Sequence, residues 1–442
     1  MSSYLQIAIA FCSIAVLLGL MGFVRHIARQ QGWSAEVQRK LIHVATGLYA
    51  LTLPWLFSSD WPIYLLVAVS LGVLLVLRIP SIAKSGVGAA IHSVERKSYG
   101  EIFFILSVGI TFFLSDGELV FFVLPIAVLT LADAAAALTG SSYGRKFFAV
   151  EQGKKSVEGT AIFFLIALVL SMFCLLILSD IPRLNVVVLS IAVAAFGTLI
   201  EAESWRGLDN FFIPVGLLLF LMENLRAPLP ELGLVLGGFA LALGAFHWLG
   251  RWLGLKPHTV RVYVIAAFLL VSVAHLQNAL IPVLALFAHA WAQIRAPGFA
   301  EHPHLDMVAA LGFVSIGWLA LGGAMAMNAI TFYGLTALGW AISLTTLALS
   351  RKGLASRAVA AIPVAISLLV LFLALSTFDQ GADARGALML PLAVAVVLVA
   401  MVPALISPGL FARGRVAKVA VLSLALPLPA YLVTAMPWAE WI

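Results

Sequence analysis

Apolar runs of membrane-spanning length recur from one end of this chain to the other. Of its 442 residues, 63% are hydrophobic and only 10% are charged, which is more apolar surface than a water-soluble fold can bury. A helix needs about 20 apolar residues to cross the hydrocarbon core of a bilayer. We therefore predict an all-α fold, a polytopic transmembrane helical bundle of about 16 spans in two halves.

The two halves differ in character. Nearly all of the polar chemistry lies before residue 226, and Asn224–Pro230 is the best linker candidate because of its prolines and polar residues. We predict a first membrane domain over residues 1–226 and a second over residues 227–442. The second contains no recognisable motif, so we expect it to have an accessory, oligomerising or substrate-presenting role.

Lysine and arginine gather in alternate loops, as the positive-inside rule predicts for a multi-pass protein. The first apolar run has no basic residue before it and meets Arg25 and Arg29 after it, so the N-terminus is predicted outside. The basic loops of the first half then face the cytoplasm. This bias also explains the formal charge of +6 without nucleic acid. Cys12 and Cys174 both lie in apolar runs, which excludes a disulfide scaffold.

The segment LADAAAALTGSSYGRKFF, Leu131–Phe148, carries a carboxylate inside an apolar run. A charge near the middle of a membrane helix costs about 2.5–3.5 kcal/mol, so it usually faces a protein interior or a watery cavity. Asp133 lies roughly 10 Å from the glycine at 140 along a helix, which a cleft open to the cytosol could reach. Taken alone, Asp133 is equally well explained as an aspartate that bonds to a neighbouring helix.

Other charged residues and glycines gather on the same predicted cytoplasmic face. The acids sit at or just inside helix ends: Glu101, Glu158, Glu201, Glu203 and Asp209. Between them lie the cations Arg145, Lys146, Lys154 and Lys155, and the glycines Gly100, Gly140, Gly144, Gly153 and Gly159. Carboxylates and phosphate oxygens hold Mg²⁺, cations neutralise phosphate, and glycines let backbone amides approach it. This predicts a nucleoside triphosphate–metal site without a P-loop motif, although topology alone would also explain the basic pairs.

Five segments, in order, resemble the motifs of the dolichol kinase/phytol kinase family. They are RKLIH (Arg39–His43), SYGEIFF (Ser98–Phe104), LADAAAALTGSSYGRKFF (Leu131–Phe148), GKKSVEGTAIFF (Gly153–Phe164) and TLIEAESWRGLDNFFIPV (Thr198–Val215). The resemblance, over residues 35–225, implies an integral-membrane kinase that uses CTP and Mg²⁺ to phosphorylate a lipid alcohol such as phytol, a polyprenol or dolichol. Related cytidylyltransferases end in a glycine-rich motif with a paired Asp-Arg, which is absent here.

The resemblance also implies which residues form the site. The nucleotide-phosphate motif contains Asp133, Gly140, Gly144, Arg145 and Lys146. The second nucleotide loop contains Lys154, Lys155, Ser156, Glu158 and Gly159. The late acidic motif contains Glu201, Asp209, Asn210 and Pro214. We expect Asp133 and Asp209 to hold Mg²⁺, or one to do so while the other accepts the hydroxyl proton, with Glu201 or Glu158 next. His43 is expected to hydrogen-bond at the interface or to orient a carboxylate or phosphate. Lys40 and Glu101 belong to the same motifs.

Two other functions stay open from the residues themselves. A CTP:lipid-phosphate cytidylyltransferase would need the same nucleotide and metal but would release pyrophosphate. A proton-coupled secondary transporter could use Asp133, Glu201 and the histidines of the second half, although transporters place such groups near the membrane midplane in both halves. The stretch Glu301–Asp306 alternates histidine and acid, but Pro303 breaks the helical spacing of a metal site.

Overall fold

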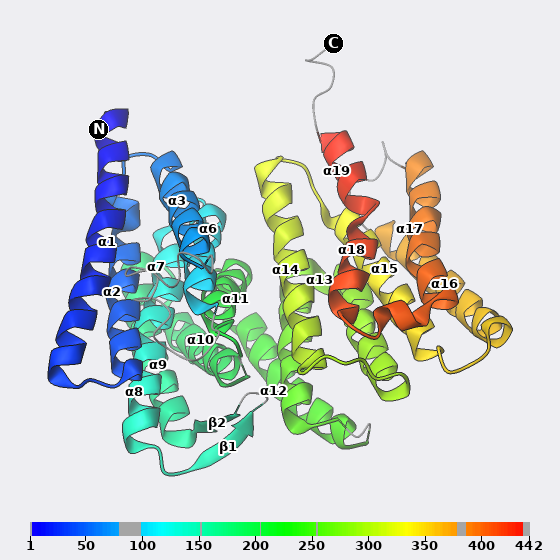
Figure 1. Ribbon diagram of the computed structural model, residues 1–442, viewed down its shortest axis with the longest axis horizontal. Coiled ribbons are helices and arrows are strands. Elements are labelled where there is room, and N and C mark those ends of the chain that lie inside the picture. Colours follow the sequence, from blue (N-terminus) through cyan, green and yellow to red (C-terminus); the bar gives the residue numbers. More distant parts are fainter. Residues whose placement is uncertain are drawn as a thin grey trace. The chain divides into compact units, whose positions relative to one another are not determined.

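The structure is a computed structural model that describes residues 2–78, 99–150, 153–203, 205–252, 255–377 and 386–435. The chain divides into two compact units, Met1–Gly244 and Ala245–Ile442 (Figure 1). The boundary falls within a helix, whereas the sequence indicated a change of character at residues 226–227. Lys84, Arg96 and Lys97, which the sequence places in a cytoplasmic loop, lie outside the described residues.

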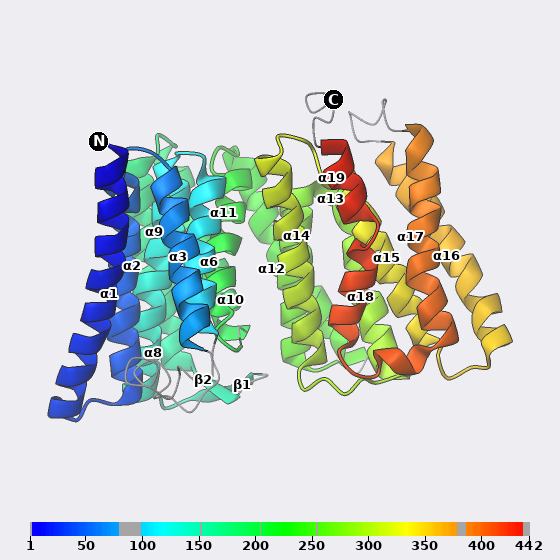
Figure 2. The ribbon, with the colours of Figure 1, turned by 45° about the horizontal axis from the view of Figure 1, so that its top comes forward.

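Helices make up most of the first unit. They are α1 (Ser3–Gln31), α2 (Ala35–Leu56), α3 (Trp61–Leu77), α6 (Gly100–Ser115), α7 (Leu119–Ala127), α8 (Asp133–Tyr143), α9 (Val157–Leu178), α10 (Arg183–Glu203), α11 (Asp209–Asn224) and α12 (Leu229–Trp252). A π-helical turn, η1 (Val128–Ala132), joins α7 to α8, so that Leu119–Tyr143 form one long helix. Figure 2 shows the long helices of this unit running side by side.

Local signals set the turn between α1 and α2. Gly32, with φ of 64°, ends α1 in the left-handed conformation that glycine adopts without strain. Ser34 begins α2, because its side chain accepts a hydrogen bond from the backbone N–H of Val37 at 3.3 Å. The turn is short, and it places Lys40 and His43 within the first three turns of α2.

The core of the first unit forms around α7, η1, α8, α10 and α11. Leu129 and Ala132 are 0% exposed and lie in the turn that precedes Asp133. The outer face of α9 is different, because Leu165, Val169 and Phe173 follow one another at four-residue spacing and are all more than half exposed. An enclosed inner face and an exposed apolar outer face are what a helix needs when protein lies on one side and lipid on the other.

One β-hairpin interrupts the helices of the first unit, so the expected all-α fold is correct apart from this element. Strands β1 (Phe147–Val150) and β2 (Gly153–Ser156) are antiparallel, with Phe147 opposite Ser156 and Val150 opposite Gly153. Figures 1 and 2 both place the hairpin at the same end of the unit as the α1–α2 turn. Two sets of basic residues that the sequence assigns to the cytoplasmic side therefore share one end of the unit.

The second unit packs around α15 (Ile330–Ala348), whose Trp340 is 1% exposed. The other elements are α13 (Pro257–Arg295), α14 (Pro303–Ala324), α16 (Leu354–Ser376), α17 (Gly386–Ile406), η2 (Pro408–Phe411), α18 (Arg415–Leu424) and α19 (Pro427–Ala435). Helix α13 is kinked at His275, where φ is 58° and ψ is 164°. Its 39 residues are about twice the number that one membrane crossing requires.

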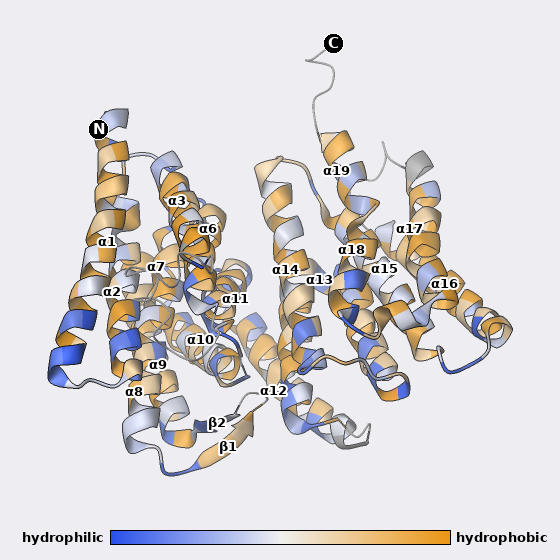
Figure 3. Cartoon of the chain, viewed as in Figure 1, coloured by the Kyte–Doolittle hydropathy of each residue, from blue (hydrophilic) through white to orange (hydrophobic). Residues whose placement is uncertain are grey.

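Eleven helices of the described chain are long and apolar enough to cross a membrane, and Figure 3 shows hydrophobic residues along them. The chain is a multi-pass integral membrane protein. The expected count of about 16 spans is not confirmed. Helices α3 and α6 are apolar but short, α2 carries charges in its first turns, and α13 counts once despite its length.

Candidate active site

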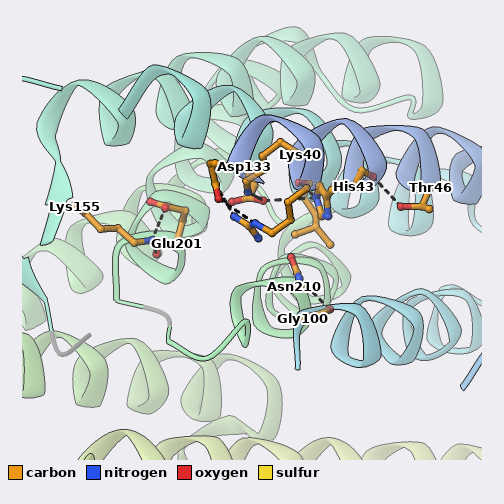
Figure 4. Close-up of polar contacts among 11 residues, drawn as sticks. Lys40, His43, Thr46, Gly100, Asp133, Lys155, Glu201 and Asn210 are labelled. Carbon is orange, nitrogen blue, oxygen red and sulfur yellow. Dashed lines mark hydrogen bonds and ion pairs between the residues drawn. The ribbon is translucent and has the colours of Figure 1, made fainter. Parts of the chain in front are cut away.

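An ion pair between α2 and α8 forms the centre of the candidate site. Lys40 Nζ lies 2.5 Å from Asp133 Oδ2, and the two side chains are 3% and 5% exposed (Figure 4). A buried charge is costly unless it is paired, so this bond fixes α2 against α8. Asp133 does bond to a neighbouring helix, and it does so through a cation.

His43 lies one helical turn beyond Lys40 and contacts both backbone and carboxylate. Its Nε2 lies 3.1 Å from the carbonyl oxygen of Leu129 and 3.6 Å from Asp133 Oδ2. The ring of Phe104 packs edge-on against the imidazole, with 5.4 Å between centroids. Leu129 belongs to η1, where the π-helical turn interrupts the usual α-helical hydrogen bonds. His43 therefore ties this irregular turn to α2, directly before Asp133.

A close approach of α2 to η1 makes these contacts possible. A Cβ added to Gly47 would lie 2.1 Å from Thr130 Oγ1, so only glycine fits at this position. Neither Gly47 nor Thr130 is among the residues that the sequence indicated. The sequence does contain a signal for this contact. Lys40, His43 and Gly47 follow one another at spacings of three and four residues and therefore share one face of a helix.

A second ion pair joins the hairpin to α10. Lys155 Nζ donates hydrogen bonds to Oε1 and to the backbone carbonyl of Glu201. The other carboxylate oxygen, Oε2, is enclosed and has no hydrogen-bond partner in the described part of the chain. Burial lowers the pKa of Lys155, but the attraction of Glu201, Asp209 and Asp133 outweighs burial, and the pKa is raised. Asp133 and Asp209 thus both lie close enough to act on Lys155.

The late acidic motif reaches the site at the start of α11. Asp209 is the first residue of this helix and is half-buried. Asn210 is buried, and its Nδ2 donates to the carbonyl oxygen of Gly100 at 3.0 Å (Figure 4). The backbone N–H of Tyr99 donates to the carbonyl oxygen of Arg206 at 3.4 Å. These bonds hold the beginning of α6 against the loop that carries Asp209.

The hairpin is anchored to the start of α9 by backbone hydrogen bonds. Ser156 Oγ accepts from the N–H of Gly159 at 3.0 Å and caps the helix. The carboxylate of Glu158 accepts from the N–H of Lys146 at 3.2 and 3.3 Å, and the N–H of Val157 donates to the Lys146 carbonyl at 2.8 Å. Glu158 therefore holds the backbone of the hairpin in this structure.

The structure separates the expected site residues into two sets. The inner set consists of the buried residues Lys40, Asp133, Glu201 and Asn210 and the half-buried residues His43, Lys155 and Asp209. The exposed set consists of Arg145, Lys146, Lys154 and Glu101, and Glu101 pairs with Arg78 at 3.2 Å. Lys154 and Lys155 are neighbours in β2, and successive side chains of a strand point to opposite faces, so only Lys155 reaches Glu201.

Helices α8 and α9 approach each other at the glycines of the two nucleotide motifs. A Cβ on Gly159 would lie 2.8 Å from the carbonyl oxygen of Ala136 and 3.3 Å from the Cα of Gly140. A Cβ on Gly144 would lie 2.5 Å from the carbonyl oxygen of Gly140 and 2.9 Å from Ser156 Cβ. These glycines therefore permit helix packing beneath the hairpin.

Replacing Gly159 by alanine is expected to destabilise the protein by about 1–3 kcal/mol, because the new methyl group overpacks a backbone contact. The midpoint of thermal unfolding of purified protein in detergent measures this. Gly72→Ala in α3 is the matched control, because a Cβ there meets nothing within 4 Å. Equal midpoints for the two variants would contradict the close packing of α8 on α9.

Two polar side chains of the second unit bond one of its helices to another. Tyr263 of α13 and His304 of α14 are joined by a hydrogen bond of 2.8 Å between the phenol oxygen and Nδ1. His302 Nε2 lies 3.7 Å from a carboxylate oxygen of its neighbour Glu301. Within the described ranges, no three side chains from His, Cys, Asp and Glu are grouped to hold a metal ion.

The side chains of the first unit nevertheless fit a magnesium ion that substrate oxygens would complete. Mg²⁺ commonly takes one or two protein carboxylates and fills its remaining positions with phosphate oxygens and water. Asp133, Asp209 and Glu201 all act on Lys155. Glu201 Oε2, which is buried without a partner among the described residues, is an unused oxygen ligand.

The fold and the site define an integral membrane protein with paired lysines and carboxylates buried in its first helical unit. The chain is 32% identical over 191 residues to the phytol kinase of Synechocystis sp., a similarity that covers 41% of this chain and 76% of that kinase. The chain belongs to the phytol kinase family. No protein-family model and no solved structure matches it. The kinase relationship expected from the five motifs is confirmed at the level of the family.

Proposed function

We propose that the chain is an integral-membrane kinase that transfers the γ-phosphate of CTP to an isoprenoid alcohol of the phytol or polyprenol type. Membership of the phytol kinase family supports the reaction class. The observation that carries the proposal to residues is the two ion pairs Lys40–Asp133 and Lys155–Glu201, with Asp209 close enough to act on Lys155. The choice of CTP rests on the resemblance of the five motifs.

The buried and half-buried carboxylates are suited to bind the metal ion that phosphoryl transfer requires. Asp133 and Asp209 would hold Mg²⁺, with Glu201 beside them, and the ion would neutralise charge on the β- and γ-phosphates. Phosphoryl transfer needs mainly positioning and electrostatic stabilisation, so few further groups are required.

The lysine and arginine side chains of the site and the hairpin are suited to bind the polyphosphate of the nucleotide. Lys155 and Lys40 are each bonded to a carboxylate, and each ammonium group has three donors, so it can bond a phosphate oxygen in addition. Arg145, Lys146 and Lys154 are exposed around the hairpin, where they would attract the nucleotide.

The proposed orientation places the hairpin end of the first unit in the cytoplasm, with the N-terminus outside. The basic residues of the α1–α2 turn and of the hairpin share this end, as the positive-inside rule favours. CTP would then enter from the cytosol, and the isoprenoid tail would remain among apolar helices or in the bilayer. The second unit would have an accessory or substrate-presenting role.

The test uses the purified full-length protein in lipid nanodiscs, with CTP radiolabelled in its γ-phosphate. The acceptors are phytol, farnesol, geranylgeraniol, a dolichol and diacylglycerol, and ATP replaces CTP in a parallel series. We expect transfer of label to an isoprenoid alcohol, loss of transfer on chelation and recovery on addition of Mg²⁺. Pyrophosphate release with a lipid phosphate would instead identify a cytidylyltransferase, and no reaction with any acceptor would contradict the kinase.

A further inference from the structure

His43 presents one bound and one unbound ring nitrogen at the edge of the carboxylate cluster. Nε2 lies 3.1 Å from the Leu129 carbonyl oxygen, whereas Nδ1 makes no hydrogen bond to any described residue. A carbonyl oxygen only accepts hydrogen bonds, so Nε2 must carry the hydrogen. A neutral imidazole has a single N–H, and the lone pair therefore lies on Nδ1.

The fold fixes both this tautomer and the direction of the ring. The π-helical turn supplies the acceptor, Phe104 packs edge-on against the ring, and Asp133 Oδ2 lies 3.6 Å from Nε2. Figure 4 shows His43 beside the Lys40–Asp133 pair. A nitrogen base whose opposite nitrogen is held by a carbonyl and a carboxylate is the arrangement that activates hydroxyl nucleophiles elsewhere.

We infer that Nδ1 of His43 is the general base that receives the proton of the substrate hydroxyl. The inference rests on the proposed kinase function and adds a residue that touches the acceptor alcohol. It differs from the expectation from sequence, which gave proton abstraction to a carboxylate and gave His43 an orienting or interfacial role.

The hydroxyl oxygen of the alcohol forms a bond to the γ-phosphorus of the nucleotide, and the bond from that phosphorus to the β,γ-bridging oxygen breaks. The bridging oxygen keeps the electron pair and leaves with the nucleoside diphosphate. The hydroxyl proton moves to the Nδ1 lone pair, and the resulting imidazolium later returns it to solvent.

Charged groups of three helices face His43. Burial and Lys40 of its own helix oppose a positive imidazolium, whereas Asp133 of α8 and Asp209 of α11 favour it. Asp133 is less suited to be the base, because its Oδ2 already accepts from Lys40 at 2.5 Å. Separate groups would then hold the metal and take the proton.

Two amide variants separate a catalytic from a structural role. In His43→Gln the amide of the longer side chain reaches the Nε2 position, so it can still donate a hydrogen bond to the Leu129 carbonyl. This variant has no basic nitrogen at the Nδ1 position. In His43→Asn the amide lies at the Nδ1 position, and the bond to η1 is lost. His26→Gln in α1 is the control, because the one hydrogen bond of the His26 ring to the described part of the chain joins it to Gln30 of its own helix, at 2.9 Å.

We expect His43→Gln to unfold at the same temperature as the wild type, to keep its KM for nucleotide and to lose about 100-fold in kcat. The wild-type rate should fall at low pH as the base is protonated, and this acid limb should be absent from the residual rate of the variant. His43→Asn should be both slow and less stable, and His26→Gln should match the wild type.

A His43→Gln variant with wild-type turnover and an unchanged pH profile would show that His43 is structural and would overturn the inference. The kinase function would survive that result. A wild-type protein that phosphorylates none of the alcohols would instead contradict the kinase function, and the inference with it, before any variant is compared.

Discussion

Asp133→Asn is expected to reduce phosphoryl transfer by at least about 100-fold, the loss typical when one preorganised charge is removed from an active site. The same change leaves the ammonium group of Lys40 buried, with a side-chain exposure of 3%, and without its carboxylate. Breaking a buried ion pair at one partner costs about 3–5 kcal/mol, so the variant should also be less stable. Alcohol-dependent transfer and thermal unfolding in detergent measure the two effects.

A double variant separates catalysis from folding at this pair. Lys40→Met with Asp133→Asn removes both charges, and replacing both partners of a buried pair is often close to neutral. We therefore expect the double variant to unfold near the wild-type temperature and still to lack kinase activity. Asp60→Asn is the matched control, because Asp60 is exposed at the start of α3 and its side chain caps nothing. Full turnover by a correctly inserted Asp133→Asn protein would exclude Asp133 from the reaction.

The enclosure of Asp133 could be predicted because a single physical rule applies to it. A carboxylate within an apolar helix must be enclosed by protein or water, and this side chain is 5% exposed beside a cation. The identity of that cation could not be predicted, because Lys40 lies 93 residues away along the chain. The pairing depends on how α2 packs against α8 and η1, which periodicity does not specify.

The π-helical turn before Asp133 could not be predicted from the sequence. A π-helical turn and an α-helical turn can carry the same apolar residues, so VLTLA reads as ordinary membrane helix. The Leu129 carbonyl of this turn is what fixes the tautomer of His43. The contact between Gly47 and Thr130 that brings the turn to α2 follows from tertiary packing alone.

The hairpin shows a second limit of the sequence. Strands of four residues are too short for a clear alternation, and Gly153 looked like a glycine for phosphate approach. In the structure Gly153 adopts a φ of +94° next to the hairpin turn, and Glu158 bonds to backbone N–H groups. The composition of this loop indicated a nucleotide loop, and its strand geometry explains why only one of its two adjacent lysines pairs with Glu201.

Lys155→Met is expected to raise the KM for nucleotide by about ten- to hundredfold, since a hydrogen bond to a charged group contributes roughly 1.5–3 kcal/mol. Lys154→Met is the comparison, because Lys154 is exposed on the other face of β2 and should change the KM by about fivefold at most. Steady-state kinetics with CTP at saturating alcohol measure both. Equal effects would show that the hairpin attracts nucleotide only through its net charge.

The raised pKa of Lys155 also predicts how the stability of the protein depends on pH. The pKa of Lys155 is raised above 10.5, so its ion pair with Glu201 stabilises the fold fully below that pH and is lost as pH rises through the higher value. The wild type should therefore keep both its unfolding temperature and its KM for nucleotide between about pH 7 and pH 9. Lys155→Met with Glu201→Gln should unfold closer to the wild-type temperature than Lys155→Met, because neither buried charge is left alone. Its KM should remain high, since the phosphates would have lost their cation.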